Sequence, residues 1–323
     1  MVKFILISYF LLFYSLTFNS CEHNQSIRDI EIQGPLELIS ISDAGLAYQL
    51  YLDGDYAYIT NNEGIVIYDI KDPSSPEKAG SIKTGVEFGI TVRDHLVYLV
   101  GNKGLHIIDV NDPANPQKLG EYNFNGKSMG VCVKGNFAYI ASSSGFYIID
   151  ISKPDNPELK THYNNEGAIW GVEVRDSIAY VANISLGLEV FDVSDPLDPQ
   201  KIKTVSATVG ACCAHIHEDL LYLGCHGKGI KVLSLSDKRL PMLIGTYNDS
   251  DDGEELGVWG DSEYLYVADN FLFEVWDVSD PANPHEIGGV CGLKGTHDIF
   301  VRDNHIFLTE ATKGLIILEF TQE

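Results

Sequence analysis

One stretch of sequence, best developed from Gly187 to Pro199, recurs along the chain and limits the possible folds more than any other feature. Only short, strand-like runs lie between its copies, and this combination is typical of β-propellers with one blade per repeat. We therefore expect an all-β fold, a seven-bladed β-propeller. The other copies lie 40 to 43 residues apart and start at Gly64, Gly104, Gly145, Gly229, Leu272 and Gly314.

The two ends of the repeated region predict how the ring closes. Leu36 to Ile41 has the pattern of a lone fourth strand, whereas Gly314 to Phe320 has the pattern of a third strand with no fourth strand after it. Both deficits disappear if the N-terminal strand completes the C-terminal blade, and this pairing also removes exposed strand edges. We expect residues 34–323 to form this single closed domain.

Paired prolines mark the loop between the third and fourth strands of a repeat. Ten of the twelve prolines occupy this position, at 73 and 76, 113 and 116, 154 and 157, 196 and 199, and 281 and 284. Proline lacks the N–H that a strand ladder needs, so the pairs belong in turns. The aspartates that end the third strands are expected to accept backbone hydrogen bonds there; they are Asp69, Asp109, Asp150, Asp192 and Asp277.

The pattern Gly-Leu-x-Ile/Val-x-Asp-Val-x-Asp-Pro-x-x-Pro, seen from Gly187 to Pro199, resembles the LVIVD repeat. The resemblance extends over about residues 36 to 320. The fifth repeat departs from it, because Ser234 replaces the strand-ending aspartate and Pro241 is its single proline. The resemblance implies a β-propeller in an exported or surface protein, and it brings no shared catalytic motif.

The charge balance excludes one class of partner. The chain has 22 lysines and arginines against 46 aspartates and glutamates, which gives a formal net charge of −24. Such a surface repels phosphate backbones and anionic lipid headgroups. We therefore expect no nucleic-acid partner, and contact with a membrane only through an N-terminal lipid anchor.

The N-terminus has the features of an export signal. Lys3 precedes an apolar run from Phe4 to Phe18, which is short for a membrane span and suits the core of a signal peptide at residues 1–20. Cys21 follows Ser20 as in a bacterial lipoprotein cleavage site, so we expect a lipid on Cys21, with plain secretion as the alternative. Residues 21–33 are then a spacer. The expected product is an exported monomer, a lipoprotein of the cell surface or of the outer membrane or periplasm.

Ligand sites in β-propellers are expected in the loops at one end of the blades. The start of the first strand and the loop between the second and third strands lie at the same end, which we call the funnel face. Loops vary there while the strands hold them rigid, so ligand sites are expected at this face. The predicted ligand-binding residues are Trp170, His226, Asp269, Phe271, His297 and Asp298.

The fifth repeat holds an unusual group of cysteines and histidines. If Glu218-Asp219 forms a two-residue hairpin, Cys212 lies opposite Cys225, close enough for a disulfide. A metal site is a second interpretation, because three possible ligands alternate along one strand. Packed thiols and ordinary core histidines are a third. The three possible metal ligands are Cys213, His215 and His217.

Two functions fit this sequence. The favoured one is a non-catalytic, exported, lipid-anchored propeller that binds a protein, peptide or glycan at its funnel face and needs no cofactor. The alternative is a hydrolase or lyase, metal-assisted or not, in which His297, Asp298 and Glu310 form an acid–base group in the same funnel. No activated nucleophile or phosphate-binding glycine loop accompanies those residues. The sequence leaves open whether the protein is an enzyme.

Overall fold

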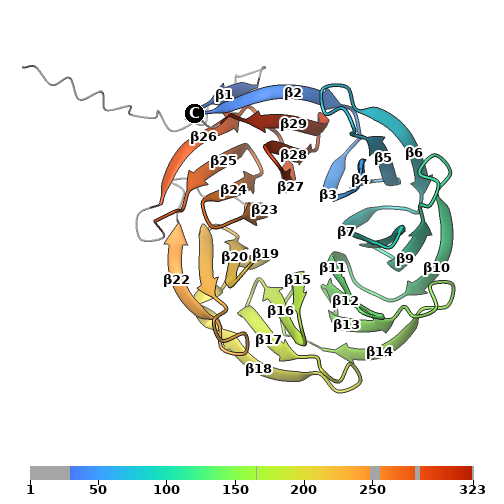
Figure 1. Ribbon diagram of the computed structural model, residues 1–323. Coiled ribbons are helices and arrows are strands. Elements are labelled where there is room, and N and C mark those ends of the chain that lie inside the picture. The colour runs from blue at the N-terminus through green and yellow to red at the C-terminus, as the bar shows by residue number, and fades with distance from the viewer. Residues whose placement is uncertain (1–29, 165, 248–254, 281–283, 322–323) are drawn as a thin grey trace, which may run out of the picture.

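The computed structural model describes residues 30–164, 166–247, 255–280 and 284–321. The expected signal peptide and Cys21 lie outside these residues. Within them the chain forms seven antiparallel sheets arranged around a common axis, so the expected seven-bladed β-propeller is confirmed (Figure 1). In the part of the chain so described, no helix has the length and apolarity needed to cross a bilayer.

Five blades each consist of four strands that are consecutive in sequence. Blade one contains β3 (Ala47–Asp53), β4 (Tyr56–Asn61), β5 (Gly64–Asp69) and β6 (Glu77–Lys83). Blade two contains β7 (Glu87–Arg93), β8 (Leu96–Gly101), β9 (Gly104–Asp109) and β10 (Gln117–Asn123). Blade three contains β11 (Ser128–Lys134), β12 (Phe137–Ser142), β13 (Gly145–Asp150) and β14 (Glu158–Tyr163). Blade four contains β15 (Ile169–Arg175), β16 (Ile178–Asn183), β17 (Gly187–Asp192) and β18 (Gln200–Val205), and the 3-10 turn η1 (Ser206–Thr208) leads to blade five. Blade five contains β19 (Ala211–His217), β20 (Leu220–Cys225), β21 (Ile230–Ser234) and β22 (Met242–Tyr247).

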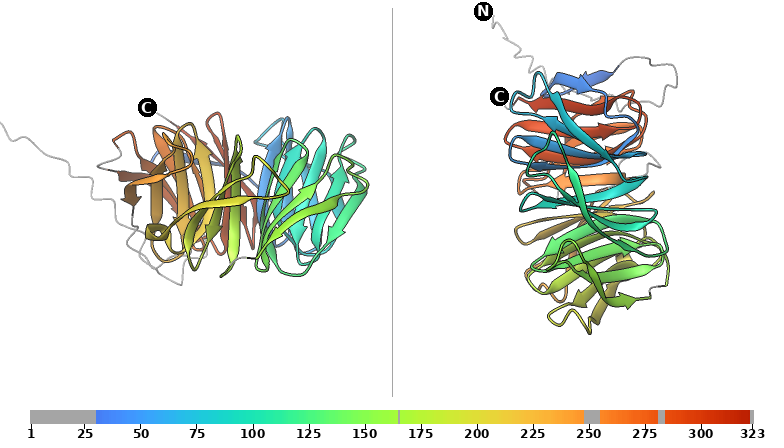
Figure 2. Two further views of the ribbon diagram at one scale, coloured as in Figure 1. Left: turned by 90° about the horizontal axis from the view of Figure 1, so that it is seen from below. Right: turned by 90° about the vertical axis from the view of Figure 1, so that its right-hand side faces the viewer.

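The last two blades receive strands from the N-terminus. Blade six consists of β23 (Glu255–Gly260), β24 (Tyr264–Asp269), β25 (Leu272–Asp277), β26 (His285–Cys291) and the short β1 (Glu31–Gln33). Blade seven consists of β27 (Thr296–Arg302), β28 (His305–Glu310), β29 (Gly314–Phe320) and β2 (Leu36–Ser42). Figure 2 shows the ring from the side, with the blue N-terminal strands against the red C-terminal ones.

The predicted closure of the ring is confirmed in register. Strand β2 pairs antiparallel with β29, with Leu36 opposite Phe320 and Ser42 opposite Leu315. Strand β1 pairs with β26, with Glu31 opposite Cys291. The pairing of β1 was not expected, because residues 21–33 were predicted to be a spacer. The folded region therefore starts before residue 34, and the N-terminal segment ties blades six and seven together.

Packing between blades explains why the second and third strands show little alternation in sequence. Strand β13 is buried along nearly its whole length. Phe146 of this strand lies with its ring centre 5.4 Å from that of Phe191 in the next blade, and both side chains are fully buried. Both faces of such a strand are covered by neighbouring blades, so both need apolar residues. Burial of one such side chain contributes about 1.5–3 kcal/mol.

The aspartates that end the third strands have the predicted role. Asp192 accepts a hydrogen bond from the backbone N–H of Ser194 at 3.0 Å, and Asp277 accepts one from Ser279 at 2.9 Å. These bonds to Ser194, together with Arg239, lower the pKa of Asp192 to about 2. The same bond is made by Asp69, Asp109 and Asp150. These residues therefore shape the proline loops, a structural role common to the repeats.

Candidate functional site

Each inner strand carries an irregularity where it begins at the funnel face. In blades two, three, four, five and seven one residue falls out of the ladder, and in blade one two residues do so. A bulge re-aims the side chain that it contains, and bulges are common at functional rims. The bulged residues differ from blade to blade; they are Tyr48 and Gln49, Phe88, Met129, Trp170, Cys212 and His297. We call these seven residues the bulge ring.

Three members of the bulge ring stack into one aromatic group. The Tyr48 ring centre lies 5.5 Å from that of His297, in a stacked arrangement, and 5.0 Å from that of Phe88, edge to face. The Lys127 ammonium lies 4.1 Å from the centre of the Phe88 ring, within cation–π range. Tyr48 and His297 are half-buried and Lys127 is exposed. A positive charge and aromatic faces therefore lie together at the rim of an acidic protein.

His297 is a neutral, fixed member of this group. Burial lowers the pKa of His297, and the charge of Lys127 lowers it further, against the opposing effects of the Ala47 hydrogen bond and Glu310. Nδ1 lies 2.8 Å from the carbonyl oxygen of Ala47, so in the neutral ring Nδ1 carries the hydrogen and donates a hydrogen bond to this oxygen. The sequence did not indicate Tyr48 or Lys127. The one available signal for Tyr48 was its neighbour Gln49, which stands where the first strands of blades two to four have a glycine.

The remaining predicted ligand residues are spread around the funnel face. Trp170 in blade four is half-buried, and His226 in the loop after β20 is exposed. Phe271 in the loop after β24 is 51% exposed, an unusual degree for a large apolar side chain, whereas Asp269 is buried. The structure places these residues on three blades.

Asp298 serves a contact between blades. Its Oδ2 accepts the backbone N–H of Leu50 at 3.0 Å, which joins the inner strands of blades seven and one. Gln49 acts similarly, because its Oε1 accepts the N–H of Ile90 at 3.3 Å. The equivalent residue in blade four is Gly171, where an added Cβ would lie 2.9 Å from the carbonyl oxygen of Cys212. Burial raises the pKa of Asp298 to about 7.

Glu310 holds the loop that follows its own strand. Its carboxylate is buried and accepts the backbone N–H of Lys294 at 2.7 Å, and it also accepts the N–H groups of Thr312 and Lys313. Asn61 and Asn183 do the same in blades one and four, since each accepts two N–H groups of its own loop. His297, Asp298 and Glu310 are therefore each engaged separately and form no shared acid–base hydrogen bond among the described residues.

The predicted disulfide between Cys212 and Cys225 is wrong. Glu218-Asp219 does form the two-residue hairpin, since His217 pairs with Leu220. The bulge then shifts the register, so that Ala211 rather than Cys212 pairs with Cys225. Both cysteines are thiols, and each donates to a backbone carbonyl: Cys212 to Gly224 at 3.3 Å and Cys225 to Thr208 at 3.7 Å.

Cys213, His215 and His217 share one strand face but do not gather around a point. Among the described residues no group of three or more His, Cys, Asp or Glu side chains is arranged to hold a metal ion. His215 lies with its ring centre 5.2 Å from that of Trp259 in the next blade. Burial, with a contribution from His217, lowers the pKa of His215 to about 4. His215 is therefore a packed core histidine, as the third interpretation of the sequence expected.

A row of side chains below the bulge ring faces the axis. The pKa of Tyr51 is raised by burial, then by Glu173, with a smaller contribution from Cys132, although these residues belong to blades one, four and three. Side chains of such separate blades influence one another because all three point inward. Burial raises the pKa of Glu173 to about 7.

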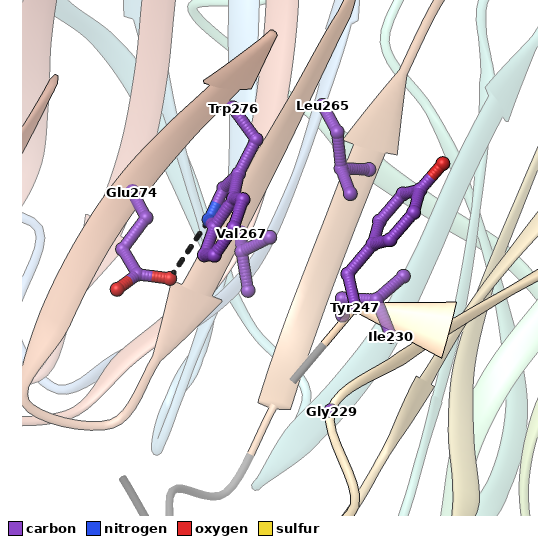
Figure 3. Close-up of a pocket in the computed structure, with 7 residues that line it drawn as sticks. All are labelled: Gly229, Ile230, Tyr247, Leu265, Val267, Glu274 and Trp276. Atoms are coloured by element: carbon purple, nitrogen blue, oxygen red, sulfur yellow. Dashed lines mark hydrogen bonds between the residues drawn. The ribbon is translucent and has the colours of Figure 1, made fainter. Parts of the chain in front are cut away.

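A small cavity lies between blades five and six. Its volume is about 10 Å³, and its lining includes Ile230, Tyr247 and Trp276 (Figure 3). Trp276 donates from Nε1 to Glu274 at 3.0 Å. The volume is enough for about one water molecule.

Comparison with known proteins identifies the repeats. The LVIVD repeat family matches residues 44–84, 89–124, 125–165, 166–206 and 253–291. These segments correspond to blades one to four and six. Blade five is unmatched, in keeping with its altered third strand and single proline, and blade seven is split between the two ends of the chain. No curated protein matches the chain.

Solved structures resemble the chain in fold. The β-propeller domain of Cps50 (Swd1) from Myceliophteria thermophila is 12% identical, with a TM-score of 0.72 over 89% of this chain and 100% of that domain. The computationally designed protein Ika8 is 9% identical, with a TM-score of 0.61 over 87% of this chain and 98% of the designed one. Identities this low support a shared propeller fold and nothing about ligands.

Proposed function

The chain belongs to the LVIVD repeat family, and from this premise we propose that it is a non-catalytic binding propeller that recognises a protein, peptide or glycan at its funnel face. The observation that carries the proposal is the bulge ring. Its side chains differ between blades, whereas the strands and proline loops repeat. Residues that differ between equivalent positions of the blades are not required by the shared fold, so they are available for recognition.

The chemistry of the bulge ring suits a ligand with both apolar and polar surface. Tyr48, Trp170 and His297 are half-buried rings that offer flat faces together with hydrogen-bonding atoms. Aromatic residues of this kind dominate binding surfaces because they contribute large contact area at small entropic cost. Lys127 beside Phe88 adds a cation that favours a carboxylate or another acceptor on the ligand.

A binding role suits the funnel residues better than an acid–base reaction. His297 donates to Ala47, Asp298 accepts from Leu50, and Glu310 accepts from the loop that follows it. A general acid or base has to reach the reacting atom of a substrate. Each of the three groups is already used to hold strands or loops in place, so we do not favour the hydrolase or lyase.

The test is a comparison of two variants on panels of immobilised glycans and peptides. Trp170→Ala removes a ring from the funnel face, and we expect it to weaken the bound ligands by at least about tenfold, the usual effect at a binding hot spot. Leu197→Ala is the matched control, because Leu197 is 65% exposed on a proline loop at the opposite face. The proposal fails if the two variants bind like the parent protein, or if both lose binding equally.

We also propose that the propeller is exported and anchored by a lipid on Cys21. The apolar run up to Phe18 and the Ser20-Cys21 pair support this proposal. Mass spectrometry of the mature protein is the test: an N-terminal diacylglyceryl-cysteine at residue 21 is expected. A lipid-modified sulfur cannot join a disulfide. Peptide mapping that finds Cys21 in a disulfide would therefore refute the anchor.

A further inference from the structure

Ring closure leaves one loop of the propeller incomplete. In blades one to five the loop that joins the third strand to the fourth packs against the preceding blade. Tyr180 of blade four donates its hydroxyl to the carbonyl oxygen of Lys238 in the loop of blade five, at 2.9 Å, and Thr161 of blade three donates to Pro196 in blade four, also at 2.9 Å. In blade seven no such loop is possible, because β29 and β2 belong to opposite ends of the chain.

A groove of about 550 Å³ lies where this loop is interrupted, between blades six and seven. It is on the face opposite the funnel, which we call the turn face, beside the hairpins that follow β23 and β27. The aromatic side chains Trp259, Tyr264, Tyr266 and Phe320 line it. The ring centre of Phe320 is 4.9 Å from that of Tyr264, and that of Tyr266 is 5.6 Å from that of Trp259. A continuous aromatic wall therefore extends along the groove.

Tyr266 is a largely buried member of this wall, and its side chain lines the groove. Tyr266 is 3% exposed, and no described residue hydrogen-bonds to its hydroxyl. Tyr180 and Tyr222 occupy the same position in blades four and five, and their hydroxyls donate to carbonyl oxygens of the following blade. The Tyr266 hydroxyl is therefore able to hydrogen-bond to a group that enters the groove.

Four carboxylates surround the aromatic wall. Asp261 and Glu263 come from the hairpin of blade six, Asp303 from that of blade seven, and Glu319 from the end of β29. Among the described residues that line the groove there is no lysine, arginine or histidine. Oδ1 of Asp261 already accepts the N–H groups of Glu263 and Tyr264 at 2.8 and 2.7 Å. Glu319 shares one oxygen with the Asn304 amide, so its other oxygen is available to a ligand.

We propose that this groove binds a cationic side chain, the guanidinium of arginine or the ammonium of lysine, presented by a basic peptide. Aromatic faces attract such cations, and carboxylates at the rim pair with them. The ring of Trp259 covers the apolar stem of the bound side chain, and the hydroxyl oxygen of Tyr266 accepts one of its N–H groups. Glu319 supplies the opposite charge. This site is separate from the bulge ring and does not depend on the function proposed for it.

Calorimetric titration with acetyl-Gly-Arg-Gly-amide tests the proposal, with the citrulline peptide as the uncharged counterpart. We expect the citrulline peptide to bind at least about tenfold more weakly, and Glu319→Gln to weaken the arginine peptide by about tenfold, because each loses a charge-assisted pair. Tyr266→Phe is expected to weaken it about threefold to tenfold by removing a single hydrogen bond. Added sodium chloride lowers the affinity as it screens the charges.

Two control variants show whether the arginine peptide binds in this groove rather than elsewhere on the acidic surface. Asp94→Asn neutralises the hairpin position of blade two that corresponds to Asp303, and Leu197→Ala removes an exposed side chain from the proline loop of blade four; both are expected to bind the arginine peptide unchanged. Equal affinity for the arginine and citrulline peptides, or undiminished binding by Glu319→Gln, would overturn the proposal. Binding that becomes at least about tenfold tighter in the full-length Arg28→Gln variant would instead assign the groove to the chain's own N-terminal segment.

Discussion

At Asp298 a carboxylate in a poorly solvated position replaces the glycine found in most inner strands. It accepts the N–H of Leu50 in the first blade, so it spans the place where the last blade meets the first. Burial raises its pKa from 3.8 to about 7. A raised pKa means that the folded state is destabilised when the carboxyl group is charged. The stability of the ring therefore depends on pH through this residue.

Asp298→Asn is expected to remove part of this pH dependence. The folded state keeps the proton up to about pH 7, whereas the unfolded chain loses it near pH 4, so the parent protein loses stability as the pH rises between these values. Asparagine retains an oxygen for the Leu50 N–H and carries no charge. Urea unfolding at pH 4 and pH 7 should show the variant gaining at least about 1 kcal/mol relative to the parent at the higher pH. An identical pH profile for the two proteins would contradict this.

At the scale of the strands, the outer strand of a blade is fitted to the proline loop of the next. A Cβ added at Gly120 in β10 would lie 2.1 Å from the carbonyl oxygen of Pro154, and one added at Gly80 would lie at the same distance from that of Pro113. Thr161 takes this position in blade three and bonds the loop through its hydroxyl. The loop and the neighbouring strand therefore pack backbone to backbone.

Gly120→Ala is expected to destabilise the protein by about 2–3 kcal/mol, because the backbone of the next blade has to move. Gly135→Ala is the control, since Gly135 has a φ of +57° in a hairpin and no atom within 4 Å of an added Cβ. It should cost only about 1 kcal/mol of backbone strain. Chemical denaturation gives both values, and a Gly120→Ala protein no less stable than Gly135→Ala would contradict the packing argument.

The elements also show which features the sequence could predict. The repeat period and the proline pairs specified the strands, their order and the closure by Leu36 to Ile41, because each depends on local pattern. The bulge at Cys212 was not predictable in this way. It shifts the register by one residue, so the predicted Cys212–Cys225 pairing was wrong. The groove beside Tyr266 was also missed, because it results from a loop that the chain does not have.

For the molecule as a whole, closure depends on β2. Its partner β29 contains Ile316 and Leu318, which are fully buried between blades, and its outer edge is covered only by β2. Leu36 is itself buried against blade six, and the partly buried Ile30 and Ile32 pack against the same cluster. Removing β2 would expose a long, flat, apolar edge, the kind of edge that natural sheets avoid.

A chain that starts at Asp43 is therefore expected to melt at least about 10 °C below the parent and to form oligomers through β29, since the loss of several kcal/mol shifts a domain of this size by this much. A chain that starts at Pro35 lacks only β1 and should remain monomeric with a smaller loss. Differential scanning calorimetry and light scattering distinguish the two. A peptide covering residues 34–43, added to the shorter chain, should pair with β29 and raise its melting temperature in proportion to the logarithm of peptide concentration. If the shorter chain stays monomeric and melts with the parent, then contacts between inner strands hold the ring closed and β2 only covers an edge.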